Sequence, residues 1–225
     1  MRYSTTRTIR KVLLALATVV IFTIILLPPL ILFLTSIKTE VDSMSFPPKW
    51  IFTPTVKNYV EVFRTTRLLR YTLNSLIVAS LNSGASLALG TLAAYGLARF
   101  RFKGSDNLSF WMLSVRMMPP VAAIIPIYII MKTVRLLDTP WALVIIYLTF
   151  NLPLVVWMMK GFFEDIPKEI EESALIDGCS EMAVFRRIAL PLVAPGLAAT
   201  AIIVFIFSWN EFLFALILTG TRAVT

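Results

Sequence analysis

Apolar residues along the chain are gathered into five long blocks that are separated by polar segments. The blocks cover residues 12–36, 72–98, 108–131, 139–159 and 193–218. At about 1.5 Å of rise per residue, each block is long enough to cross a hydrocarbon core of about 30 Å. Because backbone polar groups must be satisfied inside lipid, each block is predicted to be a helix. The pattern predicts an all-α fold, a polytopic transmembrane helix bundle that forms a single domain over residues 1–225.

Two of the blocks contain prolines. Pro28 and Pro29 lie in the first block, and Pro119, Pro120 and Pro126 lie in the third. We expect these residues to kink the helices without ending them, because neighbouring helices can satisfy the freed carbonyls. The first block is too long for a cleaved signal peptide and is expected to be a retained span.

The connections between the blocks differ in length and composition. Residues 99–107 and 132–138 form short basic turns. Residues 37–71 contain three prolines and one tryptophan, which favours an extended segment along the membrane interface with a short amphipathic helix over 58–69. The remaining connection, residues 160–192, joins the fourth block to the fifth.

Composition supports a membrane protein and argues against several other classes. The residues are 58% hydrophobic and the mean hydropathy is +0.82, whereas soluble domains are about half apolar. There is no histidine and one cysteine, Cys179, so the commonest general base and metal ligand are missing. Neither H-E-x-x-H nor G-x-S-x-G occurs, and Gly84 and Gly90 are not followed by G-K-[ST]. We therefore expect neither an enzyme nor a metal site, and no ATP site in this chain.

The net charge of +8 is best explained by anchoring at the membrane interface, because the basic residues flank the apolar blocks. No nucleic-acid partner is expected. With the N-terminus inside, the inner segments carry eleven Lys and Arg residues and the outer segments carry nine. The positive-inside rule therefore favours a cytoplasmic N-terminus in a multi-pass membrane protein.

The segment EESALIDGCSEMAVFRRIALP, residues 171–191, predicts a helix, a turn and a second helix outside the membrane. Pro167 and the acids after it are typical of a helix start, and Asp177-Gly178 is a turn signal. A second helix is expected from about Ser180. The acidic residues predicted on the outer surface of this segment are Glu171, Glu172, Asp177 and Glu181. An interfacial helix on anionic lipid is usually basic, so the acidic surface favours a protein partner.

This segment resembles the EAA motif of binding-protein-dependent ABC transporter permeases. The residues that match the motif are Glu172, Ala174, Asp177, Gly178, Ile188, Leu190 and Pro191. Ser173 and Cys179 stand in place of alanines, and both are small. The segments NLPLVVWMMKGFFEDIPKEIEE and FSWNEFLFALILT are similar to the carbohydrate, maltose-type branch, and the resemblance covers nearly the whole chain.

The resemblance implies an inner-membrane permease subunit that forms half of the pathway for a sugar. The matching residues would form a cytoplasmic coupling helix that docks on an ATPase subunit, which binds ATP and Mg. The expected partners are a second homologous permease, two copies of the ATP-binding subunit and an extracytoplasmic solute-binding protein, in addition to membrane lipid and the sugar. Residues 37–71 and 132–138 are where the binding protein is expected to dock. No cofactor is expected on this chain.

The family has six spans in this subunit, whereas five are visible in the sequence. TRAVT, residues 221–225, resembles the lead-in to the sixth. We therefore expect the sixth span to be missing from this chain.

Polar residues inside the apolar blocks are candidate substrate contacts. An intramembrane acid is costly and favours a functional role, so Asn210 and Glu211 either face the translocation pathway or hold the bundle by interhelical hydrogen bonds. The same alternatives apply to Asn151. Arg116 is either a partner of Glu211 or a residue that reaches the cytoplasmic interface.

The small residues of the second block are interpreted as packing positions. They recur at a spacing of four, as Ser86, Gly90, Ala94 and Ala98 beside Ser80, Gly84 and Ala88. The alternative functions are import of a non-sugar solute such as glycerol phosphate, a non-transport membrane scaffold and an intramembrane enzyme.

Overall fold

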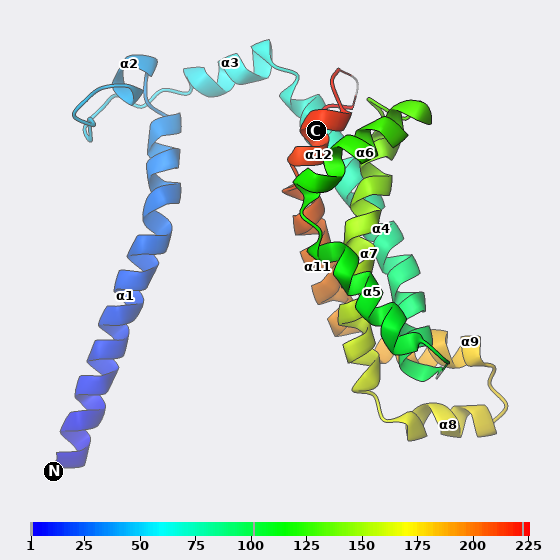
Figure 1. Cartoon of the computed structure of the whole chain (residues 1–225). Helices are drawn as coiled ribbons and strands as arrows, with labels where there is room; N and C mark the ends of the chain where they lie inside the picture. Colours follow the sequence, from blue (N-terminus) through cyan, green and yellow to red (C-terminus); the bar gives the residue numbers. More distant parts are fainter. Residues whose placement is uncertain (1, 101, 222) are drawn as a thin grey trace. The chain divides into compact units, whose positions relative to one another are not determined.

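The computed structural model describes residues 2–100, 102–221 and 223–225 (Figure 1). These residues form helices and no strand, which confirms the predicted all-α fold. The helices in chain order are α1 (Arg2–Ser36), α2 (Glu40–Ser43), α3 (Lys57–Thr65), α4 (Leu68–Arg99), α5 (Ser105–Met117), α6 (Pro120–Thr133), α7 (Pro140–Glu164), α8 (Lys168–Ile176), α9 (Glu181–Val184), the π-helix η1 (Phe185–Ala189), α10 (Leu190–Leu192), α11 (Ala194–Trp209) and α12 (Leu213–Leu218).

The chain divides into two compact units, Met1–Leu68 and Leu69–Thr225. In the first unit, α1 is continuous through Pro28 and Pro29, and no residue between 10 and 36 is buried. The segment after α1 is folded on itself and includes α3, where the short amphipathic helix was predicted. The Asn58 amide donates hydrogen bonds to the carbonyls of Ser36 and Lys38, at 2.9 and 2.7 Å.

The second unit is a helix bundle. In Figure 1, α4, α5, α7 and α11 run alongside one another, with α8 and α9 at one end and α6 and α12 at the other. We call these the α8 end and the α12 end.

One helix pair is bent sharply where the sequence predicted a continuous apolar block. Between α5 and α6 the chain turns by 93° at Met118 and Pro119. The expectation of a kink without a helix end is therefore wrong for Pro119 and Pro120, because α5 ends and α6 begins with Pro120 at its first position, whereas Pro126 lies inside α6 as expected. Consecutive prolines lack the N–H groups that would continue the hydrogen-bond ladder, and each disfavours helical dihedrals in the residue before it. The fifth block is also divided, since α11 ends at Trp209 and α12 begins at Leu213.

By length and composition, three helices in the described residues can cross a bilayer, namely Arg10–Ser36, Leu68–Arg99 and Pro140–Glu164. The number rises to five if each bent pair is counted as one span. These pairs are Asn107–Met117 with Pro120–Thr133 and Glu181–Leu192 with Ala194–Trp209, the second bent by 75°.

Two apolar clusters form the core of the second unit. The cluster toward the α8 end includes Val155, Met159, Phe163 and Phe185. The cluster toward the α12 end includes Leu143 and other residues of α4, α6, α7 and α12. Between the two clusters along α4, α7 and α11 lie the buried polar residues that are described with the site below.

Small residues let the helices of the bundle approach closely. A side chain at Gly90 would meet Val155 of α7 at 2.6 Å, and one at Gly196 would meet the ring of Phe162 at the same distance. Gly90 and its neighbours at a spacing of four, Ser86 and Ala94, are buried, as the packing interpretation predicted. The second predicted stripe, Ser80, Gly84 and Ala88, is exposed in this chain.

Asp138, in the turn between α6 and α7, ties that turn to the end of the chain. Its carboxylate accepts hydrogen bonds from the backbone N–H groups of Gly220, Thr221 and Ala223, at 2.9, 3.0 and 3.2 Å, and from the Thr221 hydroxyl at 2.7 Å. The Asp138 N–H donates to the carbonyl of Leu218 at 2.8 Å. The backbone N–H of Gly220 and the other donors hold the pKa of the Asp138 carboxyl below its ordinary value of 3.8.

We predict that Asp138→Ala accelerates hydrogen exchange of the Gly220, Thr221 and Ala223 amides by at least about tenfold, because a hydrogen bond to a charged group contributes on the order of 1.5 kcal/mol. A carboxyl whose pKa is lowered on folding stabilises the folded state above its ordinary pKa and loses this effect as the pH falls. Protection of these amides in the unsubstituted chain should therefore decline below pH 3.8. The exposed Asp165, just beyond the other end of α7, provides the control, and Asp165→Ala should leave these amides protected. Equal exchange in the two variants would contradict the role of Asp138.

Candidate functional site

The helix–turn–helix between α7 and α11 is built by a tight glycine turn. Gly178 has φ +87°, and the Gly178 N–H donates to the Leu175 carbonyl while the Cys179 N–H donates to the Ala174 carbonyl, both at 3.0 Å. This pair of bonds is the Schellman motif that closes a helix C-terminus, and it requires a residue in the left-handed region. Ser180 then caps α9 by accepting a hydrogen bond from the Ala183 N–H. The predicted turn and the predicted helix start at Ser180 are both present.

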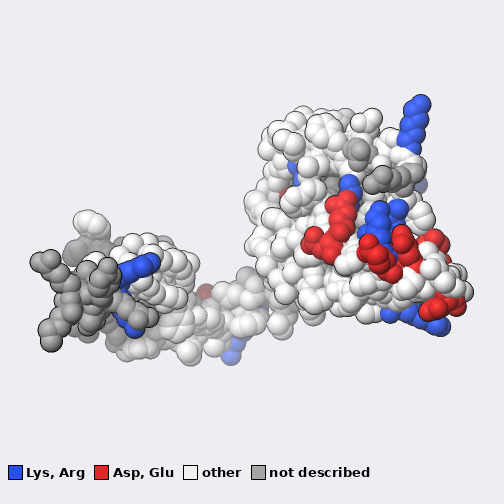
Figure 2. Space-filling view, turned by 90° about the horizontal axis from the view of Figure 1, so that it is seen from below, with Lys and Arg blue, Asp and Glu red and all other residues white. Residues whose placement is uncertain are grey.

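This end of the molecule carries many exposed charges, which Figure 2 shows from below. The exposed acidic residues here are Glu164, Asp165, Glu169, Glu172, Asp177 and Glu181, and exposed Lys168, Arg186 and Arg187 lie in the same segment. The acidic surface predicted from the sequence is present with one exception.

Glu171 is the exception, because it is 5% exposed and points into the protein. Its carboxylate accepts from Nε and Nη2 of Arg99 at 2.9 and 2.6 Å, and from the Tyr95 hydroxyl at 2.8 Å. The prediction that Glu171 lies on the outer surface was therefore wrong. Arg99 and Tyr95 lie one turn apart on α4. The last two turns of α4 therefore cover the face of α8 that carries Glu171.

The residues that match the EAA pattern are divided between the surface and the interior. Glu172, Asp177, Gly178 and Pro191 are exposed, Ala174 is buried, and Ile188 and Leu190 are half-buried. The exposed residues can contact a partner, whereas Ala174 and the two aliphatic residues fix the position of the segment against the bundle.

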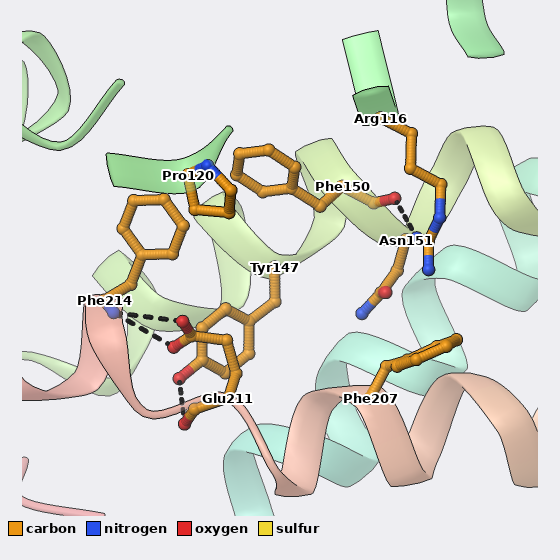
Figure 3. A pocket seen from close by; sticks show the side chains of 8 residues that line it. All are labelled: Arg116, Pro120, Tyr147, Phe150, Asn151, Phe207, Glu211 and Phe214. Atoms are coloured by element: carbon orange, nitrogen blue, oxygen red, sulfur yellow. Dashed lines mark hydrogen bonds between the residues drawn. The ribbon is translucent and has the colours of Figure 1, made fainter. Parts of the chain in front are cut away.

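A second candidate site is a cavity of about 250 Å³ in the bundle, shown in Figure 3. It lies beside the breaks that end α5 and α11. Its lining combines four aromatic rings with an arginine, an asparagine, a glutamate and a proline, namely Tyr147, Phe150, Phe207, Phe214, Arg116, Asn151, Glu211 and Pro120. A cavity with aromatic faces and a few polar groups is typical of a small-molecule site.

The two charged residues of the cavity do not form an ion pair. The Arg116 guanidinium donates to the Phe150 carbonyl at 2.8 Å and lies over the Phe207 ring, 4.8 Å from its centroid. The Glu211 carboxylate accepts from the N–H groups of Phe214, at 3.1 Å for each oxygen, and of Ala215 at 3.4 Å. Both sequence-based alternatives for Arg116 were wrong, because it is anchored to α7 inside the bundle.

Glu211 thus caps the N-terminus of α12, where the break after α11 leaves backbone N–H groups without helical partners. The Asn210 amide donates to the Ile206 carbonyl of its own helix at 2.9 Å, and its side chain is exposed. Neither side chain forms the interhelical hydrogen bond that was one alternative, and only Glu211 lines the cavity of Figure 3.

Asn151 does form interhelical hydrogen bonds. Its amide donates to Oδ1 of Asn82 at 2.8 Å and to the Ser208 hydroxyl oxygen at 3.0 Å. The Asn82 amide in turn donates to the Val144 carbonyl at 3.0 Å. We call Asn82, Asn151 and Ser208 the polar layer, because the three residues join α4, α7 and α11 between the two apolar clusters. Asn82 was not predicted as a site residue, because the small residues around it are sufficient to explain close packing of this block.

Within the described residues, no group of three or more His, Cys, Asp or Glu is placed to hold a metal ion.

Residues 86–225 match the family model described as "Binding-protein-dependent transport system inner membrane component". The chain belongs to this family. A probable ABC transporter permease protein, y4oR of Sinorhizobium fredii, is 39% identical over 222 residues, which are 99% of this chain and 80% of that protein. The trehalose transport system permease protein SugB of Mycobacterium tuberculosis is 37% identical over 201 residues, which are 88% of this chain and 72% of that protein.

The fold is also that of a solved transporter. The chain matches a chain in the crystal structure of a bacterial ABC transporter involved in import of the acidic polysaccharide alginate, with a TM-score of 0.79 and 22% sequence identity. The match covers 96% of this chain and 76% of that one. The family and the fold confirm the resemblance inferred from the residues, an inner-membrane transport component.

We predict that Asn151→Ala lowers the free energy of unfolding in detergent by about 1–2 kcal/mol, since it leaves Asn82 and Ser208 short of a buried partner. Asn210→Ala is the matched control, because the Asn210 amide is exposed and bonds only within its own helix. A denaturant titration of the two variants measures the difference. Equal midpoints would show that the polar layer does not stabilise the bundle.

Proposed function

We propose that this chain is a permease subunit of an ATP-binding-cassette importer, that it forms half of the transmembrane pathway for a sugar, and that α8, the turn and α9 dock on a partner ATPase. The observation that carries the proposal is the exposed acidic helix–turn–helix closed at Gly178. Its exposed Glu172 and Asp177 are the polar contacts of the coupling segment. Hydrolysis of ATP with Mg on the partner supplies the energy, and no cofactor is needed on this chain.

The assembly that follows contains a second homologous permease, two ATPase subunits and an extracytoplasmic solute-binding protein. The α8 end then faces the cytoplasm, as does the N-terminus. The folded segment after α1 and the 132–138 turn are the docking surfaces for the binding protein.

A sugar is the substrate class that the cavity supports best. Aromatic side chains that line the cavity, such as Phe207, pack on the apolar faces of sugar rings, while the Arg116 guanidinium and the Asn151 side-chain oxygen supply polar groups for hydroxyls. The relatives agree with this class, because their names include transport of trehalose, of sulfoquinovosyl glycerol by SmoH of Agrobacterium fabrum, and of diacetylchitobiose by DasC of Streptomyces coelicolor.

A second candidate is import of an anionic solute, such as glycerol phosphate or an acidic sugar. It is favoured by the Arg116 guanidinium in the cavity wall, whereas the Glu211 carboxylate in the same wall opposes it.

We predict that Gly178→Pro reduces the amount of ATPase that co-purifies with the tagged chain by at least about tenfold, equivalent to about 1.4 kcal/mol of binding free energy. Proline cannot adopt the φ of +87° and has no N–H for the Leu175 carbonyl, so the turn that presents α8 and α9 is lost.

Gly104→Pro is the matched control, because Gly104 also has a positive φ, +98°, but lies in the turn before α5. The second permease should co-purify with both variants. Full recovery of the ATPase with Gly178→Pro would contradict the docking role of this segment.

We predict that Phe207→Ala raises the KM for sugar uptake into proteoliposomes that hold the complete complex by roughly three- to tenfold, because an aromatic face contributes about 0.5–1.5 kcal/mol. Phe205→Ala is the control, since Phe205 stacks on Trp209 at 5.9 Å and does not line the cavity. An unchanged KM in Phe207→Ala would remove the cavity from the sugar pathway, and uptake of anionic solutes alone would favour the second candidate.

A further inference from the structure

The buried cluster of Glu171, Arg99 and Tyr95 connects the coupling segment to α4, and the proposed docking surface does not include it. Glu171 lies in the first turn of α8, while Tyr95 and Arg99 lie in the last two turns of α4. We call this cluster the α4–α8 clamp.

Both oxygens of the Glu171 carboxylate accept hydrogen bonds within the clamp. Oε1 accepts from both Nε and Nη2 of Arg99, and Oε2 accepts from the Tyr95 hydroxyl. The side chains of Arg99 and Glu171 are 8% and 7% exposed. Arg99 Nη2 also donates to the Ile166 carbonyl at 3.3 Å, which holds the chain just before α8 as well. The clamp therefore fixes both the position and the direction of α8 relative to α4.

The Tyr95 ring extends the clamp to other helices. It packs on Phe163 of α7 and on Phe185 of η1, with ring centroids 5.3 and 4.9 Å away. The helix that leads into the coupling segment, α7, and the one that leads out of it, η1, thus meet at one side chain, whose hydroxyl is bound to Glu171 of α8.

A buried ion pair is rarely the most stable way to join two helices. Taking both charges out of water costs several kcal/mol per ion, so apolar pairs of similar volume are often as stable or more stable. What the ion pair provides is a defined geometry, because the bonds hold only at one relative position of the two helices. This property suits a connection that transmits a displacement better than one that only adds stability.

Helix α4 carries the connection onward to the middle of the bundle. Tyr95 and Asn82 lie on the same continuous helix, about 20 Å apart at 1.5 Å per residue. Between them, Gly90 packs directly on Val155 of α7. Asn82 then binds Asn151, whose side chain lines the cavity.

We propose that the α4–α8 clamp is the positioning connection through which movement of the ATPase-docked segment reaches the cavity. Displacement of α8 pulls Glu171, the clamp moves α4 as a rigid rod, and the polar layer passes the movement to the cavity wall. Glu171, Arg99 and Tyr95 are positioning residues, because none of them contacts the cavity or the exposed docking surface. The inference rests on the proposed function.

The test compares a buried and an exposed glutamate in the complete complex reconstituted in proteoliposomes. Glu171→Gln removes the buried charge, and Glu164→Gln removes an exposed one at the end of α7, outside the docking segment of α8, the turn and α9. Tyr95→Phe removes only the hydroxyl of the clamp and keeps the ring in its aromatic contacts. The measured quantity is the number of sugar molecules taken up per ATP hydrolysed, alongside the amount of ATPase bound. This ratio does not depend on how much of the complex folds.

We expect Glu171→Gln and Tyr95→Phe to retain the bound ATPase and its hydrolysis while uptake per ATP falls at least fivefold. Glu164→Gln should keep the ratio of the unsubstituted complex. Glu171→Gln leaves the buried Arg99 charge unpaired, which can itself destabilise the protein. The double variant Arg99→Met with Glu171→Met is the control for this effect, because it removes both charges. We expect it to recover the amount of assembled complex and to keep the low ratio.

Normal uptake per ATP in Glu171→Gln, or in the double Met variant, would overturn the inference and leave the proposed function intact. Loss of the ATPase itself from Glu171→Gln would also overturn it, since the residue would then act in docking. If no ATPase is bound to the unsubstituted chain, the proposed function fails and the inference fails with it.

Discussion

The bundle depends on one constraint, that an amide or a charged group buried among apolar helices must find its partner on another part of the same chain. Removing such a group from water without a partner costs more than a hydrogen bond between two exposed groups contributes. The buried hydroxyls of Ser83, Ser86 and Thr91 have no such partner among the described residues, and they carry no charge. The polar layer meets the constraint with two asparagines and a serine from three helices. Glu171 meets it with two donors of α4, and Glu211 meets it with the backbone of α12. Each of these groups fixes the relative position of the elements it joins.

The same constraint explains how the cavity is formed. Helix breaks after Met117 and Trp209 interrupt two apolar blocks, and breaks inside lipid are tolerated where they line a cavity and their backbone groups are satisfied. Glu211 satisfies the N–H groups at the second break. Arg116, at the end of α5, is held by the Phe150 carbonyl and the Phe207 ring. Both charged residues of the cavity are therefore held by contacts within the chain, Glu211 by the backbone of α12 and Arg116 by α7 and α11.

Much of this arrangement could be predicted from the sequence, and the part that could not has a physical reason. Apolar block lengths and the Asp177-Gly178 turn are local signals, so the helices and the helix–turn–helix were predicted near their observed positions. The sequence could not show that Glu171 is buried and Glu172 exposed. Two adjacent acids on a short polar helix give the same local pattern, and the position of the neighbouring helix decides which one is covered. The spacing of Tyr95 and Arg99 by one helical turn was the available signal, since it places an aromatic hydroxyl and a cation on one face of α4.

Asn82 illustrates the same limit inside the membrane. In the sequence it is one polar residue among small ones, and small residues are sufficient to explain close helix packing. Only the structure brings it to Asn151, and with that contact α4 acquires two fixed points, the clamp at one end and the polar layer about 20 Å away. A helix held at two such points by bonds of defined geometry cannot slide at one point without strain at the other. Direct packing of Gly90 on Val155 between them removes the room in which that strain could relax by tilting. Close packing and buried polar contacts on α4 therefore have the same consequence, since both fix the position of α8 relative to the cavity wall.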